Sequence, residues 1–259
     1  MLRTVSATRY VTPLREGGSL PAIVEAGDLG LYVVKFRGAG QGPLALVAEI
    51  VAGEIGRRLG LPVPELVFVE IDEALGRNER DYEVRQLLRA STGLNLALDY
   101  LPGSVMFDPA AGDRANADLA SAIVWFDAFV TNVDRTARNP NLLCWHKALY
   151  LIDHGAALYF HHDWPSRDTA ARSRFPLIRD HVLLSAASRL EEADAASRAR
   201  LSDAVFEQIL AHVPDAWLAP DGSEPEARRA GYVRFLRERL SESRIFVEEA
   251  IRARAAKFV

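Results

Sequence analysis

The chain has 259 residues, of which 49% are hydrophobic and 25% charged, with a net charge of −4. These values are typical of globular proteins and allow one large domain or two lobes. Acidic and basic residues are interspersed, which argues against nucleic acid as the main partner. A single cysteine, Cys144, excludes an internal disulfide and a cysteine-based metal site, and its apolar surroundings favour a core position.

Two sequence signals of membrane targeting are missing. The first residues contain no continuous apolar stretch of the kind found in secretory signals, and no segment approaches eighteen uninterrupted apolar residues. We therefore expect a cytoplasmic protein without a membrane span.

The first hundred residues predict a small α+β unit. Short runs rich in Val, Ile and Tyr predict strands over 20–25 and 29–36. Apolar residues at helical spacing then predict a helix over 44–59, which Gly60 and two prolines end. A strand over 65–71, a short helix over 82–89 and a strand over 94–101 complete a unit that we expect to end near residue 103.

The rest of the chain predicts a mostly helical unit over 104–259. A buried helix through Leu119 and Val130 leads directly into a polar loop over 132–141. A strand hairpin over 142–152 follows, then an irregular polar stretch over 160–176. Two helical hairpins are expected over 177–213 and 225–257, joined by a proline-rich linker.

The polar loop and the hairpin after it carry the strongest chemical signal. Asp134 and Asn139 lie five residues apart, and Asp153 follows fourteen residues after Asn139, within Asp153-His154-Gly155. Phosphoryl transfer from ATP needs a carboxylate to receive a hydroxyl proton, and an Asn with a second carboxylate to hold Mg²⁺. We therefore predict that Asp134 is catalytic and that Asn139 and Asp153 bind the metal, with Gly155 allowing a sharp turn. The alternative is that the loop residues only cap helices. Arg135 could pair with a nearby carboxylate or with a substrate phosphate.

A kinase also needs a lysine for the nucleotide phosphates, and Lys35 ends the predicted strand over 29–36. A lysine there could instead simply face solvent. Glu49, in the following helix, is predicted to pair with Lys35 and orient its ammonium group. Glu54 on the same helix competes for that role, and a solvated helix face is the alternative for both.

Two glycine-containing segments could approach the phosphates closely. Gly17, Gly18 and Ser19 precede the first strand, and a second candidate loop covers residues 38–42.

His161, His162 and Asp163 suggest a metal site at first sight. Adjacent side chains on an extended segment point to opposite sides, however, so we do not predict one there. His146 and His181 are not assigned a function.

These motifs together resemble HipA-like kinases and, more distantly, the phosphatidylinositol 3/4-kinase superfamily. The residues that carry the resemblance are Tyr32-Val33-Val34-Lys35-Phe36, Ala48-Glu49-Ile50, Asn132-Val133-Asp134-Arg135-Thr136-Ala137-Arg138-Asn139 and Leu151-Ile152-Asp153-His154-Gly155. The resemblance covers roughly residues 10 to 160. It implies a two-lobed protein-kinase-like fold, with a β-rich N-lobe over 1–103 and a mostly helical C-lobe over 104–259, and with ATP bound between them.

The resemblance also implies roles for individual residues. Lys35 would contact the α- and β-phosphates, Asp134 would be catalytic, and the adenine would lie near Tyr100 and Leu101. Such kinases phosphorylate Ser or Thr of proteins, and some phosphorylate a Ser in their own glycine-containing loop, for which Ser19 is the matching residue. Thr136 and His154 stand where lipid kinases usually have His and Phe, which favours a protein acceptor. The alternatives are a pseudokinase that binds nucleotide and regulates a partner, and a lipid or small-molecule kinase.

Overall fold

The computed structural model describes residues 2–14, 20–40, 42–77 and 79–258. The chain divides into two compact units. The first comprises Met1–Leu46 and Pro64–Pro102, and the second comprises Val47–Val63 and Gly103–Val259. Most of helix α1 (Gly42–Leu59) therefore groups with the second unit, although in the sequence it lies among the strands of the first.

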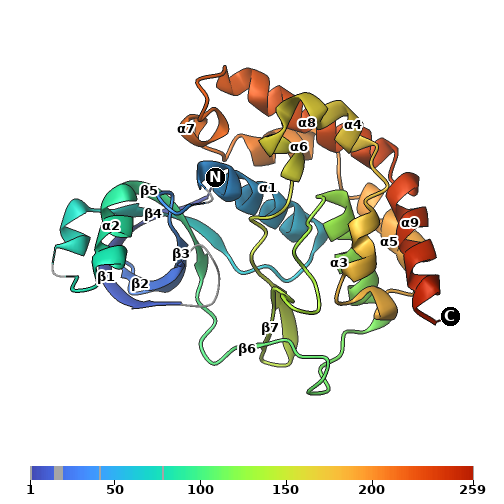
Figure 1. Ribbon diagram of the computed structural model, residues 1–259, viewed down its shortest axis with the longest axis horizontal. Helices are drawn as coiled ribbons and strands as arrows, with labels where there is room; N and C mark the ends of the chain where they lie inside the picture. Colours follow the sequence, from blue (N-terminus) through green and yellow to red (C-terminus); the bar gives the residue numbers. More distant parts are fainter. Residues whose placement is uncertain (1, 15–19, 41, 78, 259) are drawn as a thin grey trace. The chain divides into compact units, whose positions relative to one another are not determined.

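The first unit is a small closed barrel (Figure 1) with the strand order β1-β2-β3-β5-β4. Its strands are β1 (Thr4–Pro13), β2 (Ala22–Ala26), β3 (Leu31–Lys35), β4 (Leu66–Ile71) and β5 (Gly93–Asp99). Neighbours pair antiparallel except β1 and β4, which pair in parallel. Alternate side chains of β3, such as Tyr32 and Val34, fill the core, as the period of two in a strand requires. The short helix α2 (Tyr82–Ala90) adds Val84 and Leu88 to that core.

The predicted elements of this unit are confirmed except at its beginning. The strands expected over 20–25, 29–36, 65–71 and 94–101 and the helices over 44–59 and 82–89 are all present within a few residues. Strand β1 was not expected, because it is mostly polar and exposes most of its side chains. A 3₁₀ helix, η1 (Glu73–Gly76), also precedes α2.

The second unit is mostly helical, and α3 (Ala117–Phe129) lies at its centre. Nine of the thirteen residues of α3 are buried, and they occupy every side of the helix. A helix that is apolar all round must be surrounded by other elements. Its Trp125 and Phe129 rings pack against Phe246 of α9 (Arg244–Ala255). A small sheet of β6 (Val105–Met106), β7 (Leu142–Trp145) and β8 (Ala148–Leu151) follows the order β6-β7-β8.

The remaining elements of this unit are short helices and one long helix. In chain order they are η2 (Tyr159–His162), η3 (Trp164–Ser166), α4 (Arg167–Ala171), η4 (Pro176–Asp180), η5 (Leu184–Ala186), α5 (Leu190–Arg198), α6 (Asp203–Leu210), α7 (Asp215–Leu218), α8 (Pro225–Ser241) and η6 (Ala256–Phe258). The hairpin expected over 225–257 is confirmed as α8 and α9. Over 177–213 the structure has two helices, α5 and α6, but they begin only at Leu190, and the 3₁₀ turns η4 and η5 precede them. Residues 160–176 are also more regular than expected.

Buried Arg239 of α8 connects two helix ends in the second unit. Its guanidinium donates to the carbonyl oxygens of Ala128 and Phe129 at the end of α3, and of Ala170 and Ala171 at the end of α4. Carbonyls in the last turn of a helix have no partner within the helix, so the arginine satisfies them. Burial lowers the pKa of Arg239 to about 9. The end of α3, where the polar loop begins, is fixed in this way.

Candidate active site

The polar loop begins where α3 ends. Val130 follows the last helical residue, and Thr131 then adopts a left-handed conformation with a φ of 54°. A β-branched residue rarely adopts this conformation, and such positions cluster at functional sites. The reversal brings the backbone N–H of Asn132 to within 2.8 Å of the Asp127 carbonyl oxygen, so the chain turns back on the helix. The loop is therefore built directly on the buried helix.

Asp134 and Asn139, the two strongest candidates, are hydrogen-bonded to each other. The Asn139 amide nitrogen donates to Asp134 Oδ2 over 2.7 Å, and the Asn141 amide donates to the same oxygen over 3.5 Å. The backbone closes the loop as well, because Thr136 N–H donates to the Asn139 carbonyl over 3.0 Å. These side chains bind one another and do not cap a helix. The amide oxygen of Asn139 is thereby left as the atom that could meet a cation.

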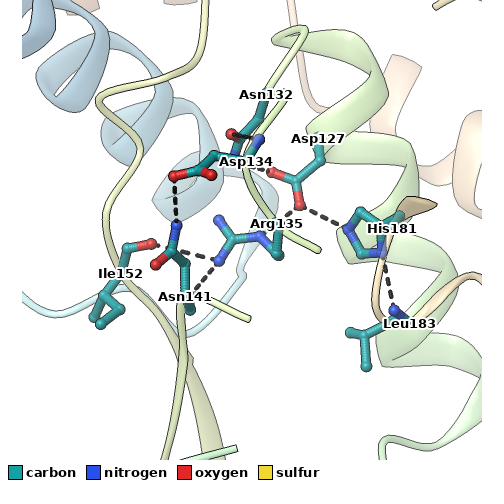
Figure 2. A network of polar contacts seen from close by, with 8 residues as sticks. All are labelled: Asp127, Asn132, Asp134, Arg135, Asn141, Ile152, His181 and Leu183. Atoms are coloured by element: carbon teal, nitrogen blue, oxygen red, sulfur yellow. Dashed lines mark hydrogen bonds and ion pairs between the residues drawn. The ribbon is translucent and has the colours of Figure 1, made fainter. Parts of the chain in front are cut away.

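A fully buried ion pair between Arg135 and Asp127 connects the loop to α3 (Figure 2). Arg135 Nε donates to Asp127 Oδ2 over 2.6 Å, and both side chains have no exposed surface. Burial by itself would raise the pKa of Asp127, but the Arg135 charge and a hydrogen bond from His181 outweigh it and hold the pKa below its usual range. Of the two partners that the sequence allowed for Arg135, the structure shows the carboxylate.

The same guanidinium also reaches the segments beside both predicted metal ligands. Arg135 Nη1 donates to the carbonyl oxygen of Asn141, and to that of Ile152 over 3.4 Å. Asn141 lies two residues after Asn139, and Ile152 directly precedes Asp153. A single buried cation thus connects the loop, the start of β7 and the end of β8.

Asp153 lies two residues after the end of β8 and adopts a left-handed backbone conformation, with a φ of 53°. A turn does follow at Gly155, closed by the Ala157 N–H, which donates to the His154 carbonyl over 2.9 Å, but Gly155 is not among the described residues with positive φ, so this turn does not require glycine. His154 is fully buried, with its ring edge against Phe126 and its Nδ1 atom 3.4 Å from Glu49 Oε1. The structure therefore brings Glu49 of α1 to the Asp153-His154-Gly155 segment.

Burial also separates the two candidate glutamates of α1. Glu49 has no exposed surface, so a solvated helix face is wrong for it. Glu54 is partly buried and forms an ion pair with Arg57 one turn later, over 3.3 Å. A fully buried carboxylate requires a polar or charged partner. Glu54 also has a buried carboxylate oxygen, Oε1, which forms no hydrogen bond within the described residues. The pairing of Glu49 with Lys35 stays a prediction.

The remaining candidates lie in the first unit. Lys35 is half-buried at the end of β3, on the strand face opposite to Val34 and the barrel core. Tyr100 and buried Leu101 directly follow β5, and Tyr100 N–H donates to the Leu31 carbonyl over 3.0 Å. The candidate phosphate turn Gly17-Gly18-Ser19 lies outside the described residues.

The structure corrects the expectation for His161 and His162. These residues lie on 3₁₀ helix η2 and not on an extended segment, so their Nε2 atoms approach to 3.2 Å. His161 is buried and its Nδ1 atom lies 3.0 Å from the Tyr232 hydroxyl. Among the described residues, no group of three or more His, Cys, Asp or Glu side chains is arranged to hold a metal ion. Cys144, placed in the core by sequence, is only partly buried in β7.

Sequence reasoning missed two members of this network, Asp127 and His181. His181 follows η4, is buried, and its Nε2 atom lies 2.9 Å from Asp127 Oδ2. Asp127 occupies an otherwise apolar helix, and a charged residue at such a buried position is a signal that could have been used. His181 comes 54 residues later and carries no local signal.

Comparison with known proteins identifies the family. A family model described as HipA-like kinase matches residues 8–244. The chain belongs to the HipA-like kinase family. A comparison with curated protein sequences gives no significant match. Among solved structures, this HipA-like kinase is similar to the proinflammatory kinase CtkA of Helicobacter pylori, at 15% identity and a TM-score of 0.58, covering 96% of this chain and 98% of that one.

The family and the fold similarity together support a kinase, as the resemblance implied. The structure is a mixed α+β fold, as predicted, and the N-terminal strands form a barrel. In the described part of this HipA-like kinase, none of the helices is long and apolar enough to span a membrane.

Proposed function

We propose that this HipA-like kinase transfers the γ-phosphoryl group of ATP, in a Mg²⁺-dependent reaction, to a Ser or Thr hydroxyl of a protein. The observation that carries the proposal is the hydrogen-bonded pair of Asp134 and Asn139 in a loop built on a buried ion pair. Phosphoryl transfer depends on positioning and charge neutralisation, and this loop supplies a fixed carboxylate and a fixed amide. We place this ATP-dependent activity in the cytoplasm.

In this proposal Asp134 receives the proton of the substrate hydroxyl. The side-chain amides of Asn139 and Asn141 both donate to Oδ2 of Asp134. We therefore propose that Oδ1 is the atom that accepts the proton of the substrate hydroxyl. The hydroxyl oxygen forms a bond to the γ-phosphorus as the bond between that phosphorus and the ADP oxygen breaks, and the proton moves to the carboxylate. Lys35 contacts the α- and β-phosphates, Glu49 orients Lys35, and Tyr100 and Leu101 lie beside the adenine. The two units would then be the two lobes of a protein-kinase-like fold.

The donor set fits Mg²⁺. Asn139 uses its amide nitrogen on Asp134, which leaves its oxygen for a cation, and Asp153 provides a carboxylate. Mg²⁺ prefers such oxygen ligands and usually completes its shell with waters and phosphate oxygens. When bound, the ion neutralises charge on the phosphates. By family analogy Ser19 is the candidate for self-phosphorylation.

A thermal melt with and without Mg-ATP tests the nucleotide site. Ligand at about 100 times its Kd stabilises a fold by roughly 2.7 kcal/mol. We expect a Mg²⁺-dependent shift in wild type that shrinks in Asp153→Asn and is retained in Asp118→Asn, whose carboxylate is exposed at the start of α3. No shift at millimolar Mg-ATP would contradict the proposal.

Labelled ATP then tests the chemistry. Transfer of label to the chain itself or to a Ser/Thr protein substrate supports the proposal, and loss of transfer in Asp134→Ala assigns it to this site. A nucleotide-dependent shift without transfer to protein, lipid or small-molecule acceptors would identify a pseudokinase instead.

A further inference from the structure

The carboxylate of Asp127 joins the adjacent polar loop to His181, which lies 54 residues further along the chain. Its Oδ1 atom accepts from the Asn132 amide over 2.9 Å, and its Oδ2 atom accepts from Arg135 over 2.6 Å and lies 2.9 Å from His181 Nε2. Figure 2 shows the three side chains converging on this one group from the loop and from the segment after η4. All four side chains are buried. Interactions with a buried charge are stronger and more directional than those at a surface.

Two of these partners act directly on the residues of the candidate site. The Asn132 side-chain oxygen accepts the backbone N–H of Asp134 over 3.2 Å. Arg135 is the next residue, and its guanidinium also holds the carbonyl oxygens of Asn141 and Ile152. Movement of the Asp127 carboxylate would therefore displace the backbone at Asp134 and beside both metal-ligand candidates.

His181 fixes the orientation of that carboxylate, and its own orientation is fixed by the backbone. Its Nδ1 atom accepts the backbone N–H of Leu183 over 3.0 Å, so Nδ1 carries no proton. The neutral ring then carries its proton on Nε2 and donates it to Asp127. The backbone around His181 is also bound to the loop independently of the imidazole ring. Val182 N–H donates to the Arg135 carbonyl over 3.1 Å, and Thr136 and His181 form a backbone bridge.

We propose that His181 is a positioning residue of the kinase, which holds Asp134 in its working place through Asp127 and the loop residues Asn132 and Arg135. His181 itself touches neither substrate nor metal in this scheme. The proposal rests on the proposed function, because it assigns the catalytic role to Asp134. It adds to that function a residue, His181, that lies 47 positions after Asp134 in the chain.

Two substitutions separate the two hydrogen bonds of His181. Gln places an amide N–H near the position of Nε2 and so keeps the bond to Asp127, while losing the acceptor for Leu183. Asn places an oxygen near the position of Nδ1 and keeps the bond from Leu183, while losing the donor to Asp127. Both variants remove one local bond and retain the backbone bridge. A purely structural role predicts similar effects of the two.

Steady-state phosphoryl transfer with Mg-ATP and a Ser/Thr protein acceptor on the full chain gives the first measurement. We expect His181→Asn to lower kcat by ~10- to 100-fold, since small displacements of a reacting group have effects of this size. Because the backbone beside Asn139 and Asp153 is displaced as well, we expect the KM for Mg-ATP to rise in His181→Asn together with the loss in kcat. His181→Gln should stay within about threefold of wild type. Equal losses in the two variants, or a wild-type kcat in His181→Asn, would overturn the proposal.

Hydrogen–deuterium exchange of a peptide covering 131–142 gives a measurement that does not depend on activity. In His181→Asn the Asp134 amide should exchange faster than in wild type, and in His181→Gln it should remain protected. If wild type transfers no phosphate, the proposed function fails, while this exchange pattern alone would still show that His181 positions the loop. Unchanged exchange in His181→Asn would overturn the positioning role whether or not the wild type is active.

Discussion

Arg135 Nε lies 2.6 Å from Oδ2 of Asp127, in a pair from which solvent is wholly excluded. Removing two charges from water is costly, and their attraction offsets that cost only when the geometry is good and the remaining polar atoms are bonded. Here the carboxylate has further hydrogen-bond donors and Arg135 Nη1 binds two carbonyl oxygens, but the buried Nη2 atom of Arg135 has no hydrogen-bond partner among the described residues. The pair therefore contributes a specific geometry to the loop more than net stability.

Breaking this pair should cost far more than breaking one at the surface. We expect Arg135→Met to lower the free energy of unfolding by about 3–5 kcal/mol, because it leaves Asp127 buried without its main countercharge. Urea unfolding measures this change. Arg244→Met is the matched control, since Arg244 forms an ion pair of similar length, 2.6 Å, with Glu248 at an exposed site. Equal effects of the two substitutions would show that the buried pair has no special importance.

Removing the proposed catalytic carboxylate should affect the rate and not the fold. We expect Asp134→Ala to lower phosphoryl transfer by ~10²–10⁴-fold, the usual contribution of a positioned acid or base. Asp134 is only partly buried, so its melting temperature should remain near that of wild type. Asp118→Ala, at an exposed site in the same unit, should retain full activity. Near-wild-type turnover of Asp134→Ala would remove Asp134 from the mechanism.

The stability of the protein should fall in acid partly through His161. Burial lowers the pKa of His161 to about 3, and the neighbouring charges of His162 and Arg228 act in the same direction. In the unfolded chain the residue takes up a proton near its usual pKa of about 6.5. The unfolded state thus binds more protons, so stability is present above about pH 6.5 and is lost as the pH falls towards 3.

His161→Gln should remove this contribution, because Gln does not titrate. Between about pH 6 and 4, the slope of the free energy of unfolding against pH should become shallower by up to ~1.4 kcal/mol per pH unit. Urea unfolding at a series of pH values provides the slopes. His146→Gln, in the exposed turn between β7 and β8, should reproduce the wild-type slope. A slope in His161→Gln as steep as in wild type would show that His161 accepts its proton in the folded state.

The loop after β3 in the first unit depends on close backbone packing at one glycine. A Cβ atom at Gly38 would lie 2.7 Å from the Cβ of Ala90 and 2.8 Å from its carbonyl carbon. We expect Gly38→Ala to cost about 1–3 kcal/mol, as overpacking usually does. Gly40→Ala places the same methyl group where nothing lies within 4 Å, and it should leave stability unchanged. Urea unfolding of the two variants gives the comparison, and similar values would contradict the packing argument.

The sequence predicted four of the five strands β1 to β5, because those four carry alternating or continuous apolar residues, but it did not predict that they close into a barrel. It did not predict β1, whose residues are mostly polar and exposed and which is held by pairing with β2 and β4. It also placed helix too early in the range 177–213, because the 3₁₀ turns η4 and η5 occupy the segment before α5. Local periodicity describes elements that bury a face, and it says little about segments that are held by their neighbours.

The sequence by itself determined which residues are candidates for the chemistry, because Asp134, Asn139 and Asp153 have a characteristic spacing and Lys35 and Glu49 precede them in that order. Only the tertiary structure decided how the loop is held. Asp127, Arg135 and His181 meet because α3 ends in a left-handed turn and the segment after η4 returns to it. Contacts between residues 54 positions apart depend on the packing of the whole unit, and for that reason no local pattern contains them.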